Sequence, residues 1–534
     1  MGAVFPQDCA RGGQRSRLRA TPTAVERERA MTRLELLRQL SFGAQVAEDE
    51  VQELANYFVE THQWNQISNG SLDIIRGEKG AGKSAIYSLL STKVDEFFDR
   101  GILLVAAENP RGTTVFRDIV SDPPATEQEF VWLWKVYILT VIAQKFKEYD
   151  IGGADARKLY AALEDAKLLA RDHDLSGMLR SARHFVRRLM KLEIQPTVEF
   201  NSSSGNPSYG GKITLGEPEA DLKQMGFNSV DSLFLLANAA LQSHGYNVWV
   251  LLDRLDVAFS ETHDLEANAL RALLRVYSDL RSFYHVSLKI FLREDIWKRI
   301  FETGFREASH INKYVMLNWS PETLLNLVIR RLLSNRVLLT EFEIDRESTL
   351  QDSKLQEEVF YRLFPKQVEQ GRQKSSTFKW MVSRCADATA KTAPRELIHL
   401  LKSVQQDEIK RLENGGALAS DGQLFDRSVF KTALLPVSTA RLHQYLYAEY
   451  PDQRELLTAL EHEKTEQTTA SLARIWGMDE VAAAQKAEKL KEIGFFERRG
   501  SRESPSYWVP FLYRDALNMI QGRADQITEG TDEE

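Results

Sequence analysis

The stretch that decides the fold is residues 76–90, which read RGEKGAGKSAIYSLL. It fits the pattern G-x-x-x-x-G-K-[ST], whose fixed positions are Gly77, Gly82, Lys83 and Ser84. The mostly apolar residues 72–75 (LDII) precede it as a buried strand does, and apolar residues recur after it at helical spacing. Because a strand, a glycine-rich loop and a helix follow in that order, the stretch predicts a phosphate-binding loop.

A loop with few side chains lets consecutive backbone N–H groups surround phosphate oxygens, and the helix that follows adds a favourable dipole. The predicted nucleotide-binding residues are Gly77, Glu78, Lys79, Gly80, Ala81, Gly82, Lys83, Ser84 and Ala85. Lys83 is expected to reach the β- and γ-phosphates of ATP, and Ser84 to bind Mg²⁺. The alternative interpretation is a glycine-rich turn before an ordinary helix.

Composition sets broad limits on the chain. Its 534 residues are 43% hydrophobic and 27% charged, which predicts a soluble globular protein of three or four domains. The net charge of -7 argues against a protein that coats nucleic acid without specificity. Two cysteines, Cys9 and Cys385, cannot build a disulfide framework, which favours a cytoplasmic location. No apolar run is long enough to cross a bilayer, so no membrane partner is expected.

Strand-like and helix-like stretches alternate along the first three fifths of the chain. The expected strands cover residues 72–76, 102–107, 248–252, 287–292 and 313–318. This alternation predicts an α/β fold with a doubly wound parallel sheet, which places a nucleotide at the carboxyl ends of the strands.

The predicted domains follow from changes in pattern. A flexible leader (residues 1–40) precedes a P-loop ATPase core (41–319), a helical lid (320–434) and a winged-helix-like domain (435–534). Within the core, residues 111–245 are expected to form a helical and β-hairpin insertion, with the hairpin at 195–218. Helical periodicity begins at Met31, which is an alternative start of the chain.

A second acidic pattern stands at the end of the strand 248–252. Asp253 closes this strand, which is expected beside the strand of the glycine loop, and is predicted to hold Mg²⁺ through water. Asp256 is expected to orient or deprotonate the attacking water. Arg254 stands where many such ATPases carry Glu, so hydrolysis is expected to be slow. Two surface aspartates in a turn are the alternative.

Three arginines are candidates for contact with the phosphates. Arg293 ends the strand 287–292, where a γ-phosphate sensor stands, and Arg395 begins a helix of the predicted lid as a second sensor. Arg306 is the candidate arginine finger, acting on a neighbouring subunit. A salt bridge from Arg306 to Glu307 or Asp295, and a solvent-exposed Arg395, are the alternatives.

The C-terminal part reads as two helices and a two-stranded wing. The segments are TASLARIWGM, DEVAAAQKAEKLKEIGFFERRG and RESPSYWVP. Arg498, Arg499 and Arg502 at the hairpin are the candidates for phosphate contacts. The second helix mixes both signs of charge, unlike the basic stripe of a groove reader, which favours contact with protein over DNA.

With these residues the chain resembles the AAA+/STAND branch of P-loop ATPases, including origin-recognition-type ATPases, and more closely a bacterial P-loop ATPase family. The segments that carry the resemblance are FGAQVAEDE, RGEKGAGKSAIY, WVLLDRLDVAF, KIFLREDIW, GFREASHI and YWVPFLYRDAL. The resemblance implies ATP binding, Mg²⁺ dependence and nucleotide-controlled assembly or partner engagement. Relatives of this type act in bacterial regulation or phage defence.

Three functional hypotheses result. The first is a cytoplasmic, slow, Mg²⁺-dependent ATPase whose ATP and ADP states control a homo-oligomer or a protein partner. The second is a DNA-associated ATPase that binds DNA through its C-terminal domain. The third is a nucleotide-binding scaffold with little hydrolysis.

Overall fold

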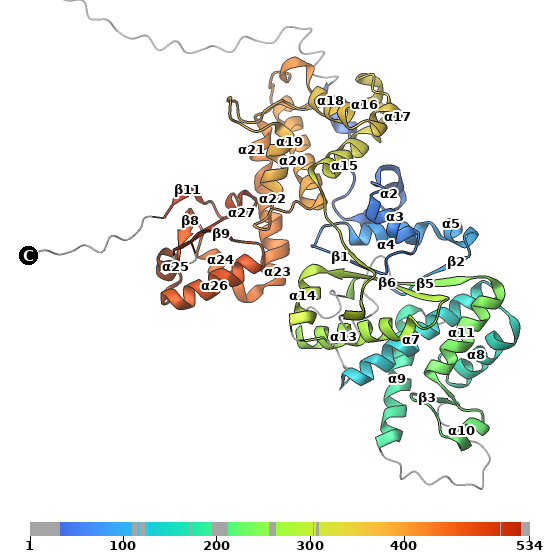
Figure 1. Ribbon diagram of the computed structural model, residues 1–534. Coiled ribbons are helices and arrows are strands. Elements are labelled where there is room, and N and C mark those ends of the chain that lie inside the picture. Colours follow the sequence, from blue (N-terminus) through green and yellow to red (C-terminus); the bar gives the residue numbers. More distant parts are fainter. Residues whose placement is uncertain are drawn as a thin grey trace, which may run out of the picture.

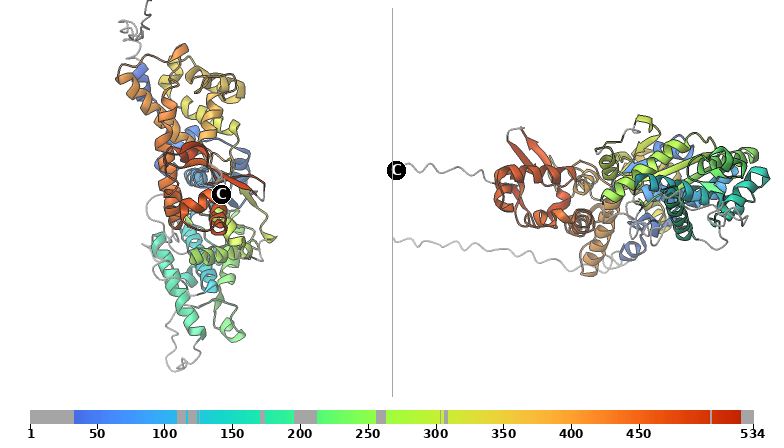
Figure 2. Two further views of the ribbon diagram at one scale, coloured as in Figure 1. Left: turned by 90° about the vertical axis from the view of Figure 1, so that its left-hand side faces the viewer. Right: turned by 90° about the horizontal axis from the view of Figure 1, so that it is seen from below.

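The structure is a computed structural model, which describes residues 33–108, 116, 124, 126–169, 174–194, 212–255, 263–302, 304–305, 309–501 and 504–524. It contains an α/β core, a helical domain (residues 320–433) and a C-terminal domain (434–524) (Figure 1). Viewed from below, the C-terminal domain stands out as a separate lobe beside the core (Figure 2).

The core is built on a five-stranded sheet whose neighbouring strands are all parallel. Its strands are β1 (Ile74–Gly77), β2 (Ile102–Ala106), β5 (Asn247–Leu252), β6 (Val286–Arg293) and β7 (Tyr314–Met316). The expected parallel α/β sheet is confirmed, and each expected strand overlaps an observed one.

The order of the strands corrects one expectation. The sheet runs β2-β5-β6-β1-β7, so β6 separates the strand that ends before Asp253 from the strand of the glycine loop. Gly77 of β1 instead pairs in register with Arg293 of β6. The alternation of strands and helices predicts a parallel sheet but leaves the order open, because each crossover can place its strand on either side of the sheet.

Helices cover both faces of the sheet. Successive side chains of a strand point to opposite faces, so strands that are apolar throughout bury side chains on both sides. On β5, Val248 and Val250 pack into one apolar cluster, whereas Trp249 and Leu251 pack into another. The first cluster includes residues of α7 (Glu127–Glu148), α8 (Gly153–Asp165), α9 (Leu175–Ile194), α11 (Val230–His244), α13 (His263–Leu280) and α14 (Glu294–Glu302). The second includes residues of α2 (Val51–Tyr57), α3 (His62–Ser68), α4 (Lys83–Thr92) and α5 (Val94–Asp99).

The aromatic helix α7 lies in the core. Trp134 is fully buried, and the Lys135 ammonium is neutralised by Asp231 and Asp279 at 2.9 and 2.8 Å. Within the described ranges, no helix combines the length and the apolar character that a membrane span requires.

The expected β-hairpin at residues 195–218 stays a prediction, and the described part of it takes part in another pairing. β3 (Ile213–Thr214) pairs in parallel with β4 (Asn228–Ser229), and α10 (Ala220–Gln224) connects the two strands. The first arm of the expected hairpin, at residues 198–200, lies outside the described residues. A short alternating run does not specify its partner, and the connection through α10 is long enough to allow a parallel pair.

The helical domain consists of helices of 4 to 20 residues. They are α15 (Pro321–Leu333), α16 (Arg336–Glu341), α17 (Arg346–Gln351), α18 (Ser353–Leu363), α19 (Thr377–Cys385), α20 (Pro394–Glu413) and α21 (Val429–Thr432). Ser320 caps α15 by accepting a hydrogen bond from the Thr323 N–H, and Pro321 occupies the first turn.

The C-terminal domain joins a helical stem to a small sheet. The stem consists of α22 (Leu434–Arg441), a π-helical turn (Leu442–Leu446), α23 (Tyr447–Glu449) and α24 (Arg454–Thr458). The remaining elements are β8 (Lys464–Thr468), α25 (Thr469–Trp476), α26 (Glu480–Glu492), β9 (Glu497–Gly500), β10 (Pro505–Trp508), α27 (Phe511–Arg514) and β11 (Ile520–Arg523). β9 and β10 form the antiparallel hairpin of the expected wing, in a sheet of order β11-β8-β10-β9.

The helical and C-terminal domains share one apolar cluster. Leu401 of α20, Val437 of α22 and Leu512 of α27 all belong to it. The helix at residues 33–39 packs into the same cluster through Leu37, so this part of the expected flexible leader is ordered. The sheet of the α/β core contributes to other clusters. The helical and C-terminal domains therefore form one packed body beside the core.

Candidate functional site

The glycine loop connects β1 to α4 as the sequence predicts. Gly80 (φ +86°) and Gly82 (φ +99°) lie in the left-handed region, which glycine enters without steric cost. A Cβ on Gly80 would lie 3.1 Å from the Cβ of Arg395, so the loop also packs closely against the start of α20. Larger residues at Gly80 would therefore disturb both the loop and its contact with the helical domain.

A cavity of about 320 Å³ gathers most of the residues that the sequence singles out. From the glycine loop it is lined by Lys79, Gly80, Ala81, Gly82, Lys83, Ser84 and Ala85, and from elsewhere by Asp253, Arg254, Arg293 and Arg395. Gly77 and Glu78 lie behind this lining, where their carbonyl oxygens accept hydrogen bonds from Lys83 Nζ at 2.8 and 3.0 Å. The structure thus brings together segments that are far apart in the sequence.

The end of β5 supplies the acidic side of the cavity. Asp253 is 4% exposed and is followed by Arg254, whose φ of +57° is unusual for a residue with a side chain. Such strained backbone is concentrated at functional sites, where the surrounding structure stabilises it. Asp256 lies outside the described residues, so its expected role stays a prediction.

The donor set of this cavity fits Mg²⁺. Ser84 and Asp253 both line it, and hydroxyl and carboxylate oxygens are the ligands that this hard cation accepts. In the described ranges, no cluster of three or more His, Cys, Asp and Glu side chains forms a metal site by itself. A metal here would therefore share its coordination with ligand phosphates and water, as Mg²⁺ does in nucleotide sites.

Part of the cavity lining is apolar. It includes Leu54, Tyr57, Phe58, Leu327 and Ile398. These residues come from α2, α15, α20 and the residue after α2, so the wall combines the core with the helical domain. Gln45, Thr61 and Gln63 add polar groups to it, an arrangement typical of small-molecule pockets.

A buried ion pair holds this wall, and sequence reasoning missed it. The Arg331 guanidinium contacts the Glu50 carboxylate at 2.6 and 3.2 Å, and both residues are less than a tenth exposed. Glu50 also accepts a hydrogen bond from the Tyr57 hydroxyl at 2.6 Å. Burial, followed by this hydrogen bond, raises the pKa of Tyr57. The only sequence signal was the segment FGAQVAEDE, which contains Glu50.

Glu108 is a second residue that sequence reasoning missed. Ala106 of β2 pairs with Leu251 of β5, so Glu108 and Asp253 follow their parallel strands at equivalent positions. Glu108 is fully buried, and Tyr87 of α4 donates a hydrogen bond to its carbonyl oxygen. Burial, and then the charges of Asp253 and Glu108, raise the pKa of Tyr87. A polar residue directly after the strand in GILLVAAENP was the available signal.

Trp319 fastens the glycine loop from the side of β7. Its indole N–H donates a hydrogen bond to the carbonyl oxygen of Ala81 at 2.8 Å, and the ring lines the cavity. The sequence pattern marks Trp319 only as the last residue of the expected core (41–319).

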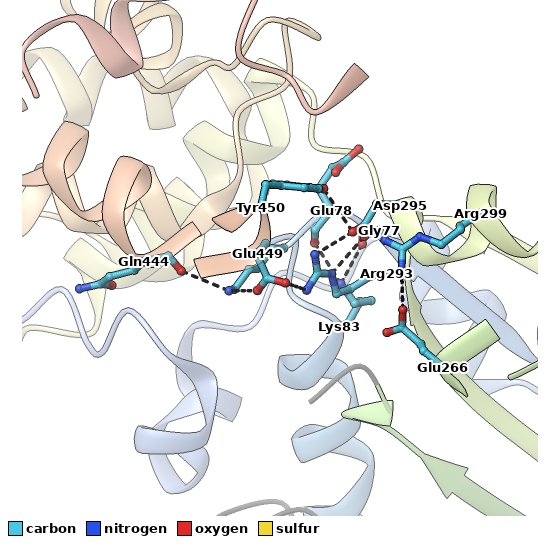
Figure 3. A network of polar contacts seen from close by, with 11 residues as sticks. Gly77, Glu78, Lys83, Glu266, Arg293, Asp295, Arg299, Gln444, Glu449 and Tyr450 are labelled. Atoms are coloured by element: carbon cyan, nitrogen blue, oxygen red, sulfur yellow. Dashed lines mark hydrogen bonds and ion pairs between the residues drawn. The ribbon is translucent and has the colours of Figure 1, made fainter. Parts of the chain in front are cut away.

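Arg293 takes part in a polar network that extends into the C-terminal domain (Figure 3). Its guanidinium contacts Asp295 through Nε at 3.1 Å and Nη2 at 2.7 Å, and Glu449 through Nη1 at 2.5 Å. Burial acts to raise the pKa of Asp295, but the charge of Arg293 outweighs it and holds that pKa below its ordinary value. Glu449 also accepts a hydrogen bond from Lys79 Nζ at 2.5 Å.

The other predicted arginines differ in what the structure shows. Arg395 lines the cavity at the start of α20, and its Nε is buried without a hydrogen-bond partner in the described structure. Arg306 lies outside the described residues, so its role as an arginine finger stays a prediction. Asp295, an alternative partner for Arg306, is engaged by Arg293.

The arginines of the C-terminal hairpin contact their own domain. Arg499 contacts the Glu497 carboxylate at 2.9 and 3.1 Å and stacks over the Trp508 ring at 4.0 Å. Arg498 lies 3.5 Å from Glu488, and Arg502 lies outside the described residues. A nucleic acid would have to compete with these carboxylates.

Comparison with known proteins leaves the family open. No protein-family model matches the chain, and neither does any curated protein. Among solved structures, the chain is similar to Cdc6p from Pyrobaculum aerophilum, with 11% identity and a TM-score of 0.29 over 86% of this chain and 93% of that one. It is also similar to the ORC2 protein of Aeropyrum pernix, with 12% identity and a TM-score of 0.29 over 88% and 93%. At these TM-scores the likeness carries no argument about fold or function.

Proposed function

We propose that the chain is a Mg²⁺-dependent ATPase that binds ATP in the cavity beside the glycine loop. The observation that carries the proposal is the convergence on one cavity of the loop, Lys83, Ser84 and the buried Asp253. The loop and the first turn of α4 offer backbone N–H groups to phosphate oxygens, and Lys83 adds a positive charge.

The charged and the apolar lining residues of the cavity suit the two parts of a nucleotide. The loop, Arg293 and Arg395 provide positive charge for the triphosphate, whereas Tyr57 and Leu327 belong to an apolar wall for the base. Since a small-molecule site combines apolar walls with a few placed polar groups, this division supports a nucleotide over inorganic phosphate alone.

Hydrolysis requires a group that accepts a proton from the attacking water. When bound, Mg²⁺ would be held by Ser84 and by Asp253 through water, and would neutralise charge on the phosphates. Glu108 is the first candidate base, because it follows β2 at the position equivalent to that of Asp253. Asp256 is the second, three residues after Asp253. Neither is the Glu directly after the strand aspartate, which supports slow turnover.

The bound nucleotide is proposed to control a homo-oligomer or a protein partner through the winged-helix-like C-terminal domain. The contacts of Glu449 with Lys79 and Arg293 support this coupling. A role in bacterial regulation or phage defence is the biological context that the sequence resemblance favours. DNA binding has less support, because Arg499 and Arg498 contact acidic residues of their own domain.

The test is equilibrium titration with a fluorescent ATP analogue. Lys83→Ala should weaken binding by at least about 100-fold, because it removes the charged ligand of the phosphates. Lys158→Ala, an exposed lysine of α8, is the matched control and should leave affinity unchanged. Equal affinities of the wild-type and Lys83→Ala proteins, with both folded, would sink the site assignment.

Turnover then separates the catalytic candidates. We expect Glu108→Gln to lower kcat by about 100-fold or more, in the range of general-base catalysis, with nucleotide affinity retained. If Asp256 is the base, Asp256→Ala should instead lower kcat by this amount. Turnover that neither substitution changes would favour the scaffold with little hydrolysis.

A further inference from the structure

One acidic side chain of the C-terminal domain reaches both cations at the mouth of the candidate phosphate site (Figure 3). Glu449 Oε1 lies 2.5 Å from Lys79 Nζ, and Oε2 lies 2.5 Å from Arg293 Nη1. Lys79 belongs to the glycine loop and Arg293 ends the strand next to it, and both line the cavity. The two oxygens of one carboxylate thus bridge two groups that suit phosphate.

The local backbone brings Glu449 to this position. The stem helix changes to a π-helical turn at Leu442–Leu446 and ends at Glu449, before Pro451. In the same stretch the carbonyl oxygen of Gln444 accepts a hydrogen bond from Lys79 Nζ at 3.3 Å, and the Tyr450 hydroxyl lies 3.4 Å from Asp295 Oδ2. π-Helical turns are rare and concentrate at functional sites.

The charges of this contact balance without a ligand. Lys79 and Arg293 carry two positive charges, and Asp295 and Glu449 carry two negative charges. Burial acts to raise the pKa of Glu449, but Arg293 and Lys79 outweigh it and hold that pKa below its ordinary value. A terminal phosphate would therefore find Lys79 and Arg293 already neutralised, unless Glu449 moves away.

We propose that Glu449 competes with the terminal phosphate of the nucleotide for Lys79 and Arg293, so that ATP releases the C-terminal domain from the glycine loop. This inference rests on the proposed function, since it requires phosphate in the same cavity. The side chains of Glu449 and Lys79 are 24% and 29% exposed, and the buried Arg293 keeps its contact with Asp295 when Glu449 leaves, so the contact can be exchanged. A triphosphate with Mg²⁺ provides the stronger partner.

ATP and ADP differ in this exchange. Only ATP adds the γ-phosphate, whose charge is directed at Arg293 in the predicted sensor position. ADP leaves Arg293 paired with Glu449, and the C-terminal domain stays docked. The helical domain turns with the C-terminal domain, because the two share one apolar cluster, and the buried Glu50–Arg331 pair between helical domain and core stays intact as the pivot of this turn.

The first experiment measures docking without nucleotide. Spin labels at Asp99→Cys in α5 and Gln485→Cys in α26, both exposed positions, report the distance between core and C-terminal domain in the full chain with Cys9→Ser. We expect Glu449→Gln to shift the distance distribution to longer values. Glu455→Gln, an exposed residue of α24, is the matched control and should leave the distribution as in wild type. Identical distributions for the two variants would contradict the proposal that Glu449 holds the C-terminal domain to the core.

The second experiment adds ADPNP, a non-hydrolysable ATP analogue, or ADP to the same labelled proteins. In the wild type, ADPNP should shift the distances as Glu449→Gln does, and ADP should not. Glu449→Gln should also bind ADPNP about five-fold more tightly, the scale of a partly exposed ion pair, with ADP affinity unchanged. ADPNP that binds without moving the labels overturns the competition.

Different results would contradict nucleotide binding in the cavity and the role of Glu449 in holding the C-terminal domain. A wild-type protein that binds neither ADPNP nor ADP overturns the proposed function and the competition with phosphate. The label distances of nucleotide-free Glu449→Gln and Glu455→Gln still decide whether Glu449 holds the domain to the core.

Discussion

The C-terminal domain has two joints, and they are built differently. Its joint to the helical domain contains the buried Arg441, 3.0 Å from Glu396 and 3.6 Å from Asp387, within a continuous apolar cluster. Its joint to the α/β core rests on Glu449, whose 24% exposed side chain contacts the 29% exposed Lys79 and the buried Arg293, which Asp295 also neutralises. A buried charge cannot lose its partners without a large desolvation penalty, whereas a partly exposed one exchanges partners easily. The first joint is therefore permanent, and the second is suited to switching.

The largest expected effect concerns the permanent joint. Arg441→Met removes the positive partner and leaves Glu396 and Asp387 with uncompensated buried charge, which should lower the free energy of unfolding by about 3–5 kcal/mol. Urea unfolding followed by circular dichroism measures it. Arg474→Met, at an exposed position of α25, is the control and should change this free energy by less than about 0.5 kcal/mol. Equal unfolding curves for the two variants would remove the distinction between the joints.

A smaller effect is expected at the switching joint. Glu449→Gln should lower the free energy of unfolding by no more than about 1 kcal/mol, since partly exposed ion pairs contribute little to stability. The same urea titration applies, with Glu396→Gln as the buried counterpart that should cost more. If Glu449→Gln destabilises the chain as much as Glu396→Gln, the core joint is structural and not a switch.

The smallest effect is the pH dependence of docking. Because the pKa of Glu449 lies below its ordinary value of 4.5 in the docked state, the undocked state binds more protons at acid pH. The stabilisation of docking is full above that ordinary value and is lost as pH falls through the lowered pKa. The label distances of the wild type should thus lengthen at acid pH towards those of Glu449→Gln, which should stay constant through this range. Parallel pH curves for the two proteins would contradict this.

Parts of the fold and site could be predicted because their signals are local. The loop around Lys83 is defined by eight consecutive residues, and Asp253 follows directly on an apolar strand. In both cases the chemistry and the backbone conformation are written in one short segment. The parallel sheet followed from the alternation of strands and helices in the same way.

The parts that could not be predicted depend on contacts between distant segments. Glu449 lies 156 residues from Arg293, and Glu50 lies 281 residues from Arg331. No local pattern marks a glutamate as the partner of a distant arginine, because exposed charged residues are common in every helix. The place of β6 between β1 and β5 also depends on contacts between distant segments, and no local pattern specifies it.

The sequence by itself determined a phosphate-binding loop, a parallel α/β sheet around it and a helix-and-hairpin C-terminal domain, because period, glycine placement and capping act over a few residues. Only the tertiary structure decided which strand lies beside the loop, that the helical and C-terminal domains pack as one body, and that Glu449 reaches Lys79 and Arg293. Those features depend on the burial of apolar surface and on charge pairs formed across the whole chain, which become defined only when the segments pack together.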